Sequence, residues 1–208
     1  MNPTIDIPGL PFPLHPSEPG AWRYDPERGT VLAAAPPHSD FYINPAGAGS
    51  ADAESLDNAV TLLGTPPPGD YQLRCRVEVE FVSQFDAGVL MLWIDGHNWA
   101  KFCFEYSPAA QPMVVSVVTR GVSDDANAFT VAGRSTWLRV SRVDGVYAYH
   151  ASLDGEVWQL IRVFSLGQDP AAHQVGFEAQ SPTGNGCRVS FDQIGFVSER
   201  LTDLRDGS

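Results

Sequence analysis

The stretch "TWLRVSRVDGVYAYHASL", residues 136–153, contains two alternating runs joined by Asp144 and Gly145. In the second run Tyr147 and Tyr149 share one parity, while His150 lies on the other. A period of two is the pattern of a β-strand, because successive side chains point to opposite faces. Asp-Gly is a favoured pair for a two-residue hairpin turn. The stretch therefore predicts an antiparallel β-hairpin.

The same alternation extends outward from this hairpin. In residues 71–81, "YQLRCRVEVEF", Leu73, Cys75 and Val77 share one parity, and the other parity is polar. Residues 87–94, "AGVLMLWI", are apolar on both parities, as in a central strand that is covered on both sides. Further strands are expected at 28–37, 39–45, 99–106, 113–120, 156–164, 174–182 and 186–198, the last with a bulge near Asp192 and Gln193.

The segments between these strands carry turn-forming residues. We expect loops or connectors at 46–60, 62–70, 107–112 and 121–128, and a short helical turn at 165–173. No segment shows a convincing helical period. Many short strands separated by Gly, Pro and Asp turns predict an all-β antiparallel sandwich or barrel.

Length and composition favour one globular unit. The chain has 208 residues, of which 43% are hydrophobic, and a β domain of this size can remain undivided. Residues 1–20 are rich in proline and lack a periodic pattern. We therefore predict an extended N-terminal arm (1–20), a single β-sandwich domain (21–200) and a C-terminal tail (201–208).

Charge limits the possible partners. The formal net charge is −12 and the sequence pI is about 4.6. Nucleic acids and anionic membranes attract clustered Lys and Arg, so neither is expected as a partner. No apolar stretch approaches the roughly 18 residues that span a bilayer, and the N-terminus lacks the pattern of a secretory signal. Three cysteines form no metal-binding spacing, and reduced thiols in the cytoplasm fit them best.

Several phrases resemble a family of concanavalin-A-like β-sandwiches catalogued as a domain of unknown function, which includes the fungal "regulation of enolase" protein. They run from "SDFYINP" (39–45) through "DAGVLMLWIDGHNWAKFCFEY" (86–106) and "SVVTRGVSDD" (116–125) to "VGFEAQSP" (175–182). The most specific element is the pattern of Trp99, Lys101 and Glu105. Tyr42 and Asp125 stand where the family usually has Trp. The resemblance implies a two-sheet jelly roll with one concave face and does not imply an activity.

Strand parity suggests a site on the concave face. If the aromatic parity faces the core, the opposite parity carries polar side chains on five strands, which meet only if those strands are neighbours. Acids, bases and amides on one curved sheet suit a polyhydroxylated ligand, with Trp93 or Tyr42 as an aromatic platform. The alternative is an ordinary polar outer face. The predicted ligand-binding residues are Lys101, Glu105, Arg120, Arg139, His150, Glu178 and Gln180.

The predicted function is binding of a carbohydrate or a similar small polar ligand. One alternative is a protein-interaction module that regulates a metabolic enzyme. A second is a cryptic glycoside hydrolase that would use Glu105 and Glu178, although no hydrolase, nucleophile-elbow, metalloprotease or phosphate-loop motif is present. No catalytic residue, cofactor or metal ligand is therefore assigned. The alternative of a structural calcium would use the loop residues Asp86, Asp95, Asp124, Asp125 and Asp192, but such residues more often form turns.

Overall fold

The computed structural model describes residues 4–47, 54–167 and 173–208. Two antiparallel sheets of seven strands form a concanavalin-A-like sandwich, which confirms the predicted fold class. In order across sheet 1 lie β1 (His15–Pro16), β6 (Val60–Gly64), β15 (Gln174–Gln180), β8 (Ala87–Asp95), β9 (Asn98–Tyr106), β10 (Pro112–Arg120) and β11 (Val122–Thr130).

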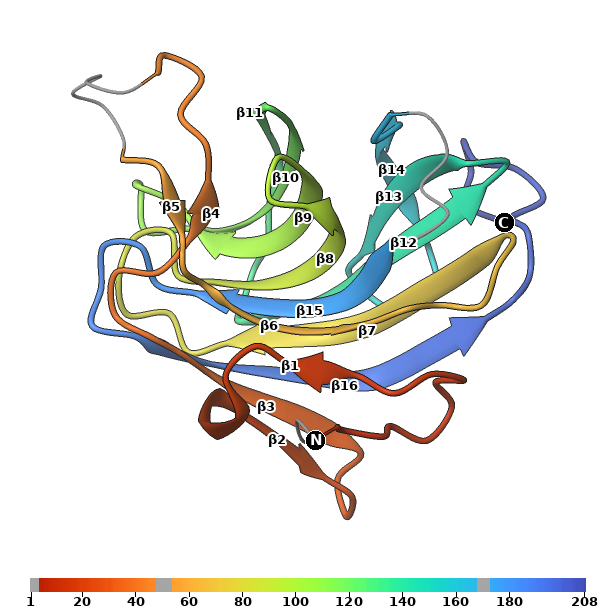
Figure 1. Ribbon diagram of the computed structural model, residues 1–208, viewed down its shortest axis with the longest axis horizontal. Coiled ribbons are helices and arrows are strands. Elements are labelled where there is room, and N and C mark those ends of the chain that lie inside the picture. Colours follow the sequence, from red (N-terminus) through yellow and green to blue (C-terminus); the bar gives the residue numbers. More distant parts are fainter. Residues whose placement is uncertain (1–3, 48–53, 168–172) are drawn as a thin grey trace.

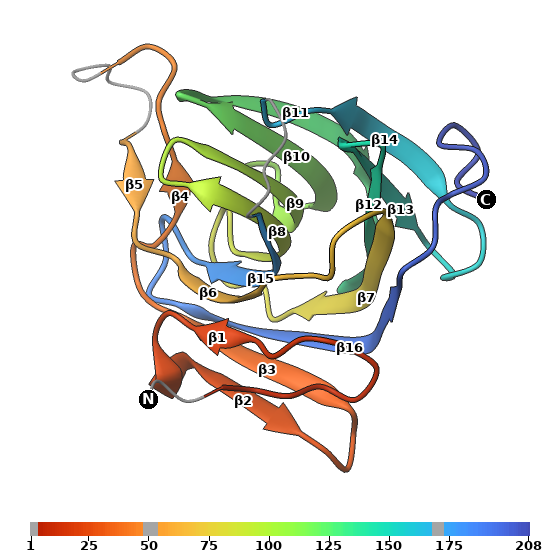
Figure 2. The same cartoon turned by 45° about the vertical axis from the view of Figure 1, so that its right-hand side comes forward.

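Sheet 2 lies against sheet 1, and strands that are distant in sequence are neighbours in both sheets (Figure 1). Its order is β14 (Gln159–Phe164), β13 (Val146–Ser152), β12 (Ser135–Val143), β7 (Tyr71–Val79), β16 (Cys187–Val197), β3 (Thr30–Ala35) and β2 (Trp22–Asp25). A third, two-stranded ladder pairs β4 (Phe41–Tyr42) with β5 (Leu56–Asp57). It projects beside β8 and β9 in both Figure 1 and Figure 2.

Local sequence signals account for several elements. The predicted hairpin is β12–β13, and Asp144 and Gly145 have φ of 51° and 77°, the left-handed values that its turn requires. The predicted bulge in β16 is confirmed by a register shift between Asp192 and Gly195 against β7. One 3-10 helix (Pro19–Ala21) is present, and the described residues contain no helix long and apolar enough to cross a membrane.

The core between the sheets consists of the aromatic parity of the strands, as expected. Phe102 of sheet 1 stacks on Tyr149 of sheet 2 with ring centroids 4.5 Å apart, and Phe177 packs on Phe191 at 4.7 Å. All four side chains are fully buried. Removing one such ring from a core costs about 3–5 kcal/mol, so these contacts fix how the two sheets are stacked.

Four segments differ from the expectations. Residues 121–128 are not a loop but most of strand β11, which pairs with β10 through residues 122–130. The expected loop at 46–60 contains β5 and the first residue of β6, and the expected connector at 62–70 begins within β6. Leu14 and Phe12 are buried in the core and β1 pairs with β6, so packing begins before Trp22. Most of the helical turn expected at 165–173 lies outside the described residues.

Candidate functional site

The outer face of sheet 1, turned away from sheet 2, carries a small cluster of charged side chains. Lys101 on β9 lies opposite Met91 of β8 and Val117 of β10. Glu105 follows on the same side of β9, because side chains four residues apart in a strand share a face. Glu178 and Gln180 share this face on β15, which pairs with the other edge of β8. The rest of the face is largely apolar, with Val89, Cys103 and Val115 buried.

The β4–β5 ladder and its flanks, here called the flap (residues 38–47 and 54–59), lie on this face. Phe41 packs edge-on against Trp93 and Trp99, with ring centroids 5.3 and 6.1 Å apart. The backbone of Ile43 exchanges hydrogen bonds with Ser123, one of them accepted by the Ser123 hydroxyl at 2.9 Å. These contacts fix the flap to β8, β9 and β11.

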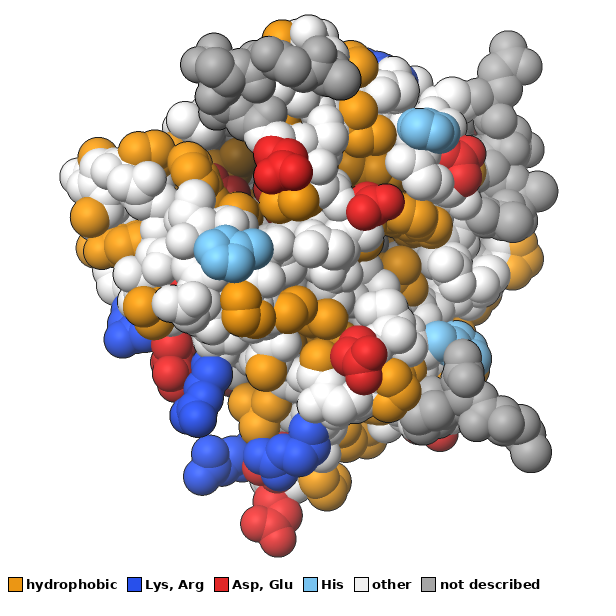
Figure 3. Space-filling view, turned by 60° about the vertical axis from the view of Figure 1, so that its left-hand side comes forward, with side chains coloured by type: hydrophobic (Ala, Val, Ile, Leu, Met, Phe, Trp, Pro, Cys, Tyr) orange, Lys and Arg blue, Asp and Glu red, His pale blue; other side chains and the backbone are white. Residues whose placement is uncertain are grey.

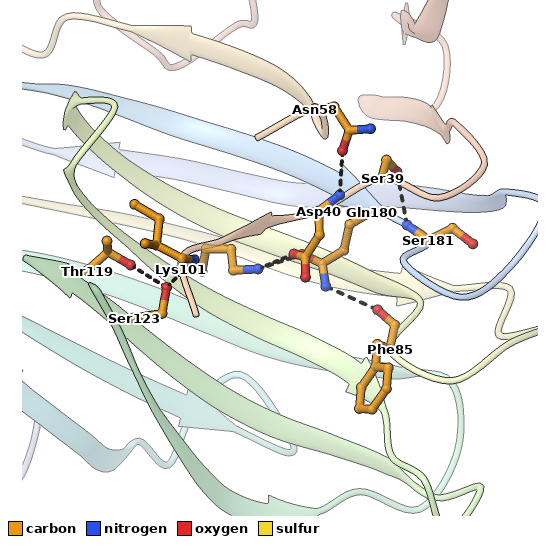
Figure 4. Close-up of polar contacts among 10 residues, drawn as sticks. Ser39, Asp40, Asn58, Phe85, Lys101, Thr119, Ser123, Gln180 and Ser181 are labelled. Atoms are coloured by element: carbon orange, nitrogen blue, oxygen red, sulfur yellow. Dashed lines mark hydrogen bonds and ion pairs between the residues drawn. The ribbon is translucent and has the colours of Figure 1, made fainter. Parts of the chain in front are cut away.

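The flap brings Asp40 to Lys101. The Lys101 ammonium donates to Asp40 Oδ1 at 2.6 Å and to Gln180 Oε1 at 2.8 Å (Figure 4). Gln180 donates in turn to the carbonyl of Phe85 at 3.1 Å. Asn58 holds Asp40 by accepting its backbone N–H. Three segments of the chain therefore meet at one ammonium group.

Burial dominates the electrostatics of Lys101. The side chain is only 3% exposed, and that of Asp40 is 16% exposed. Burial alone would lower the pKa of Lys101, but Asp40 and Glu178 outweigh it and raise the pKa above its usual value. The ammonium group therefore stays charged, and the cluster keeps one permanent cation at its centre.

Two carboxyl groups near this cation are unusual. Burial raises the pKa of Glu178 to about 8; Lys101 opposes the shift, and Asp40 and Glu105 add to it. Both Glu178 carboxyl oxygens are buried, and neither has a hydrogen-bond partner among the described residues. Burial also raises the pKa of Glu105 to about 8, with Lys101 again opposing and Asp40 and Asp125 adding. The Lys101 ammonium group therefore interacts electrostatically with more carboxyl groups than it can form ion pairs with.

A pocket of about 480 Å³ opens between the flap and sheet 1. Figure 3 shows one side of the molecule, on which most of the visible Lys and Arg side chains gather at the lower left, while acidic side chains lie both beside and above them. The residues lining the pocket are Asp40, Tyr42, Glu54, Leu56, Phe85, Lys101, Glu105, Pro108, Met113, Val115, Val117, Asp125, Asn127, Gln180, Pro182 and Thr183. Such a mixture of apolar wall and convergent polar groups is typical of a small-molecule site.

The structure brings together four of the seven predicted ligand-binding residues. Lys101, Glu105 and Gln180 line the pocket, and Glu178 lies buried beside them. Sequence reasoning missed Asp40 as a partner of Lys101, although it stands directly before the flap aromatics in a phrase that carried the family resemblance. It also treated Asp125 as a turn-former in a loop, whereas Asp125 is a β11 side chain that lines the pocket.

The expectation that the other three residues share this face is wrong. Arg120 lies on the opposite parity of β10 from Val117 and donates to the Ser165 carbonyl at 3.3 Å. Arg139 and His150 are paired neighbours on the outer face of sheet 2, because β12 and β13 belong to that sheet. Their side chains point away from the core, as those of the pocket residues do, but on the opposite outer face of the sandwich.

Arg139 and His150 instead contact the C-terminal segment. Arg139 donates to the Gly207 carbonyl at 2.6 Å and lies over the Trp158 ring at 4.3 Å. A ring nitrogen of His150 is 2.9 Å from the Leu204 carbonyl. Burial lowers the pKa of His150 to about 4, so the imidazole is neutral near pH 7. The predicted tail is therefore seated on sheet 2.

Other acidic residues that were considered as calcium ligands have local roles. Asp86 accepts the backbone N–H groups of Val82 and Ser83. Asp95 accepts that of His97 within the β8–β9 turn. In the described part of the chain, no group of three or more His, Cys, Asp or Glu side chains is arranged to hold a metal ion.

Similarity to known structures was found for nearly the whole sandwich. A functionally unknown protein from Saccharomyces cerevisiae is 25% identical, with a TM-score of 0.72, over 86% of this chain and 96% of that protein. The GH43 protein BlXynB from Bacillus licheniformis is 14% identical, with a TM-score of 0.67, over 94% of this chain. A xylan β-1,4-xylosidase from Bacillus halodurans is 12% identical, with a TM-score of 0.65, over 86% of this chain.

The present chain spans only 38% and 35% of those two enzymes, and at such identity the likeness shows the fold alone. No curated protein matches the chain. Residues 16–198, which include both sheets and the flap, match a family described as "Protein of unknown function (DUF1349)". The chain belongs to this family.

Proposed function

We propose that the protein binds a carbohydrate or a similar small polar ligand in the pocket between the flap and sheet 1. The observation that carries the proposal is the convergence of Lys101, Glu105 and Gln180 from two strands onto one partly apolar pocket. Sugars combine hydroxyl groups, which need donors and acceptors, with apolar ring faces. Tyr42 and Phe85 also line the pocket and offer aromatic surface.

The fold is compatible with this proposal. A sandwich of this fold forms part of the GH43 protein and of the xylan β-1,4-xylosidase described above. The pocket volume of about 480 Å³ lies in the usual range for small-ligand sites, roughly 300–1,000 Å³. A single sugar or a short oligosaccharide would fit such a volume.

The burial of Glu178 argues against the hydrolase alternative. Glu178 and Glu105 lie on strands that flank β8, and their register partners Val89 and Ala87 are two residues apart. Strand spacing then gives a Cα separation of roughly 12 Å. Glu178 is fully buried and does not line the pocket, so the two carboxyl groups would not flank a bound glycosidic bond as hydrolysis requires.

A glycan array followed by titration calorimetry tests the proposal. Glu105→Gln should weaken binding of any hit by at least about tenfold, because an amide replaces a charge-assisted acceptor. Glu80→Gln, at an exposed position next to β7, is the matched control and should bind like the wild type. If no glycan binds, or if both variants bind like the wild type, the pocket is not a carbohydrate site. Capture of a specific protein partner would then favour the interaction-module alternative.

A further inference from the structure

The pocket carries more negative than positive groups. Four carboxyl side chains line it, from Asp40, Glu54, Glu105 and Asp125, against the single ammonium of Lys101. That ammonium is already bonded to Asp40 and Gln180. No hydrogen bond or ion pair with a described residue satisfies the Glu105 carboxyl group. As far as the described residues go, the pocket therefore offers unpaired acceptors and no unpaired cation.

The neighbouring groups reinforce this imbalance. Glu178 lies behind the pocket, fully buried, with both oxygens unpartnered, and it interacts electrostatically with Lys101 and Glu105. Burial and the nearby carboxylates also raise the pKa of Asp125. Arg162, which also acts electrostatically on Asp125, makes its ion pair with Asp124 at 3.1 Å. The Glu105 carboxyl group, with its pKa of about 8, is largely protonated near pH 7. A second positive charge in the pocket would favour its ionised form and displace that proton.

The arrangement suits an organic cation. The carboxyl groups come from three separate elements, namely the flap, β9 and β11, and Lys101 stands among them. An alkylammonium group needs one or two acceptors and tolerates a spread of positions, whereas a hard divalent ion needs six to eight oxygens close together. The apolar wall formed by Met113, Val115 and Val117 would contact the ring that carries the amine.

We infer that the pocket selects amino sugars with a free, protonated amine, and that this amine is bound at the Glu105 side of the pocket. The inference rests on the proposed carbohydrate-binding function and narrows its ligand class. Charge-assisted hydrogen bonds are about twice as strong as neutral ones. The amine should therefore contribute more to affinity than any single sugar hydroxyl.

Three β-1,4-linked tetrasaccharides test the inference by titration calorimetry near neutral pH. They are built from glucosamine, N-acetylglucosamine and glucose, so the first two differ chiefly in whether the nitrogen carries a charge. We expect the glucosamine tetrasaccharide to bind at least about tenfold more tightly than either neutral one. Glu105→Gln should weaken binding of the glucosamine tetrasaccharide by at least about tenfold more than binding of the two neutral ones, and should so remove this preference.

Non-specific attraction is controlled by charge-matched variants. The protein has a net charge of −12, so a polycation gains some affinity anywhere on its surface. Glu80→Gln removes the same charge away from the pocket and should keep the full preference. Asp125→Asn is a second pocket variant if Glu105→Gln fails to fold, as judged by thermal denaturation.

The other outcomes separate the two proposals. Equal affinity for the three tetrasaccharides, or a preference for the N-acetylated one, overturns the amine inference while carbohydrate binding stands. Equal loss of preference in Glu105→Gln and Glu80→Gln also overturns it. Binding of none of the three overturns it, and the glycan array then decides the carbohydrate proposal independently. Equally tight binding of 1,4-diaminobutane, which has no hydroxyl groups, would overturn both.

Discussion

Replacing Glu178 by Gln should change how stability depends on pH. The folded protein raises the pKa of this carboxyl group to about 8, mainly through burial, while an unfolded chain has a value near 4.5. Between these values the folded state holds a proton that the unfolded state has lost. The free energy of unfolding therefore falls as the pH rises from about 5 to 8. The variant has no proton to lose at this position and should lack that decline.

The size of the effect follows from the shift in pKa. Each pKa unit corresponds to 1.36 kcal/mol, so the wild type should lose about 3–4 kcal/mol relative to Glu178→Gln between pH 5 and pH 8. For a chain of about 200 residues this difference is roughly 10 °C in Tm. The carboxyl group is fully buried, so solvent screening reduces the value little. The amide has nearly the same volume, which keeps the packing term small.

Urea denaturation across pH 5–8 measures this difference directly. Wild type, Glu178→Gln and the exposed control Glu80→Gln are compared at each pH, and the quantity of interest is the change in their stability difference. Glu80→Gln should follow the wild-type profile. Parallel profiles for all three proteins, within about 1 kcal/mol, would refute the reasoning. That result would mean that the Glu178 carboxylate is stabilised by a partner, such as ordered water, in the folded state.

Three further predictions concern stability and reactivity. Lys101→Met should lower the free energy of unfolding by about 3–5 kcal/mol in chemical denaturation, because it leaves Asp40 without its buried partner. Arg200→Met removes an ion pair whose Arg side chain is 56% exposed, and it should cost at most about 1 kcal/mol. Similar losses in the two variants would contradict the burial argument. Gly176→Ala should prevent stable folding, since its Cβ would overlap a backbone carbonyl of β6, while Gly96→Ala meets no atom within 4 Å and should be nearly neutral by circular dichroism. All three cysteines are buried and free, so a thiol reagent should titrate three thiols after denaturation under non-reducing conditions and none quickly before it; a missing thiol would reveal a disulfide.

Strand positions were largely predictable because apolar and polar residues alternate along the sequence of a half-buried strand. In β7, Leu73, Cys75 and Val77 are buried, as the alternation indicated. In β9 the same reasoning placed Lys101 and Glu105 on the face away from the core. The hairpin at Asp144 and the bulge after Asp192 follow from local backbone preferences. The alternation, the turn and the bulge depend on residues that are close together in the sequence, so they can be predicted from it.

The alternation failed where both faces of a strand are buried. In β10, Val114 and Val118 enter the core between the sheets, while Val115 and Val117 face the flap side of sheet 1. Residues on both faces of β10 are apolar, so the alternation did not indicate which face Arg120 would take. A different limit hid β11: it is the mostly exposed edge strand of sheet 1, so its polar residues resembled a loop.

The order of amino acids was enough to predict the strands, the all-β class of fold and the side of each clearly alternating strand, because these depend on a local hydrophobic period. Which outward faces lie together depends instead on how the strands are arranged in the two sheets. Arg139 and Glu178 both lie on the side of their strand that faces away from the core, yet their strands belong to different sheets. Asp40 reaches Lys101 across 61 residues of chain, through a flap held by hydrogen bonds to distant strands. Such a site forms through long-range packing, and no local pattern records it.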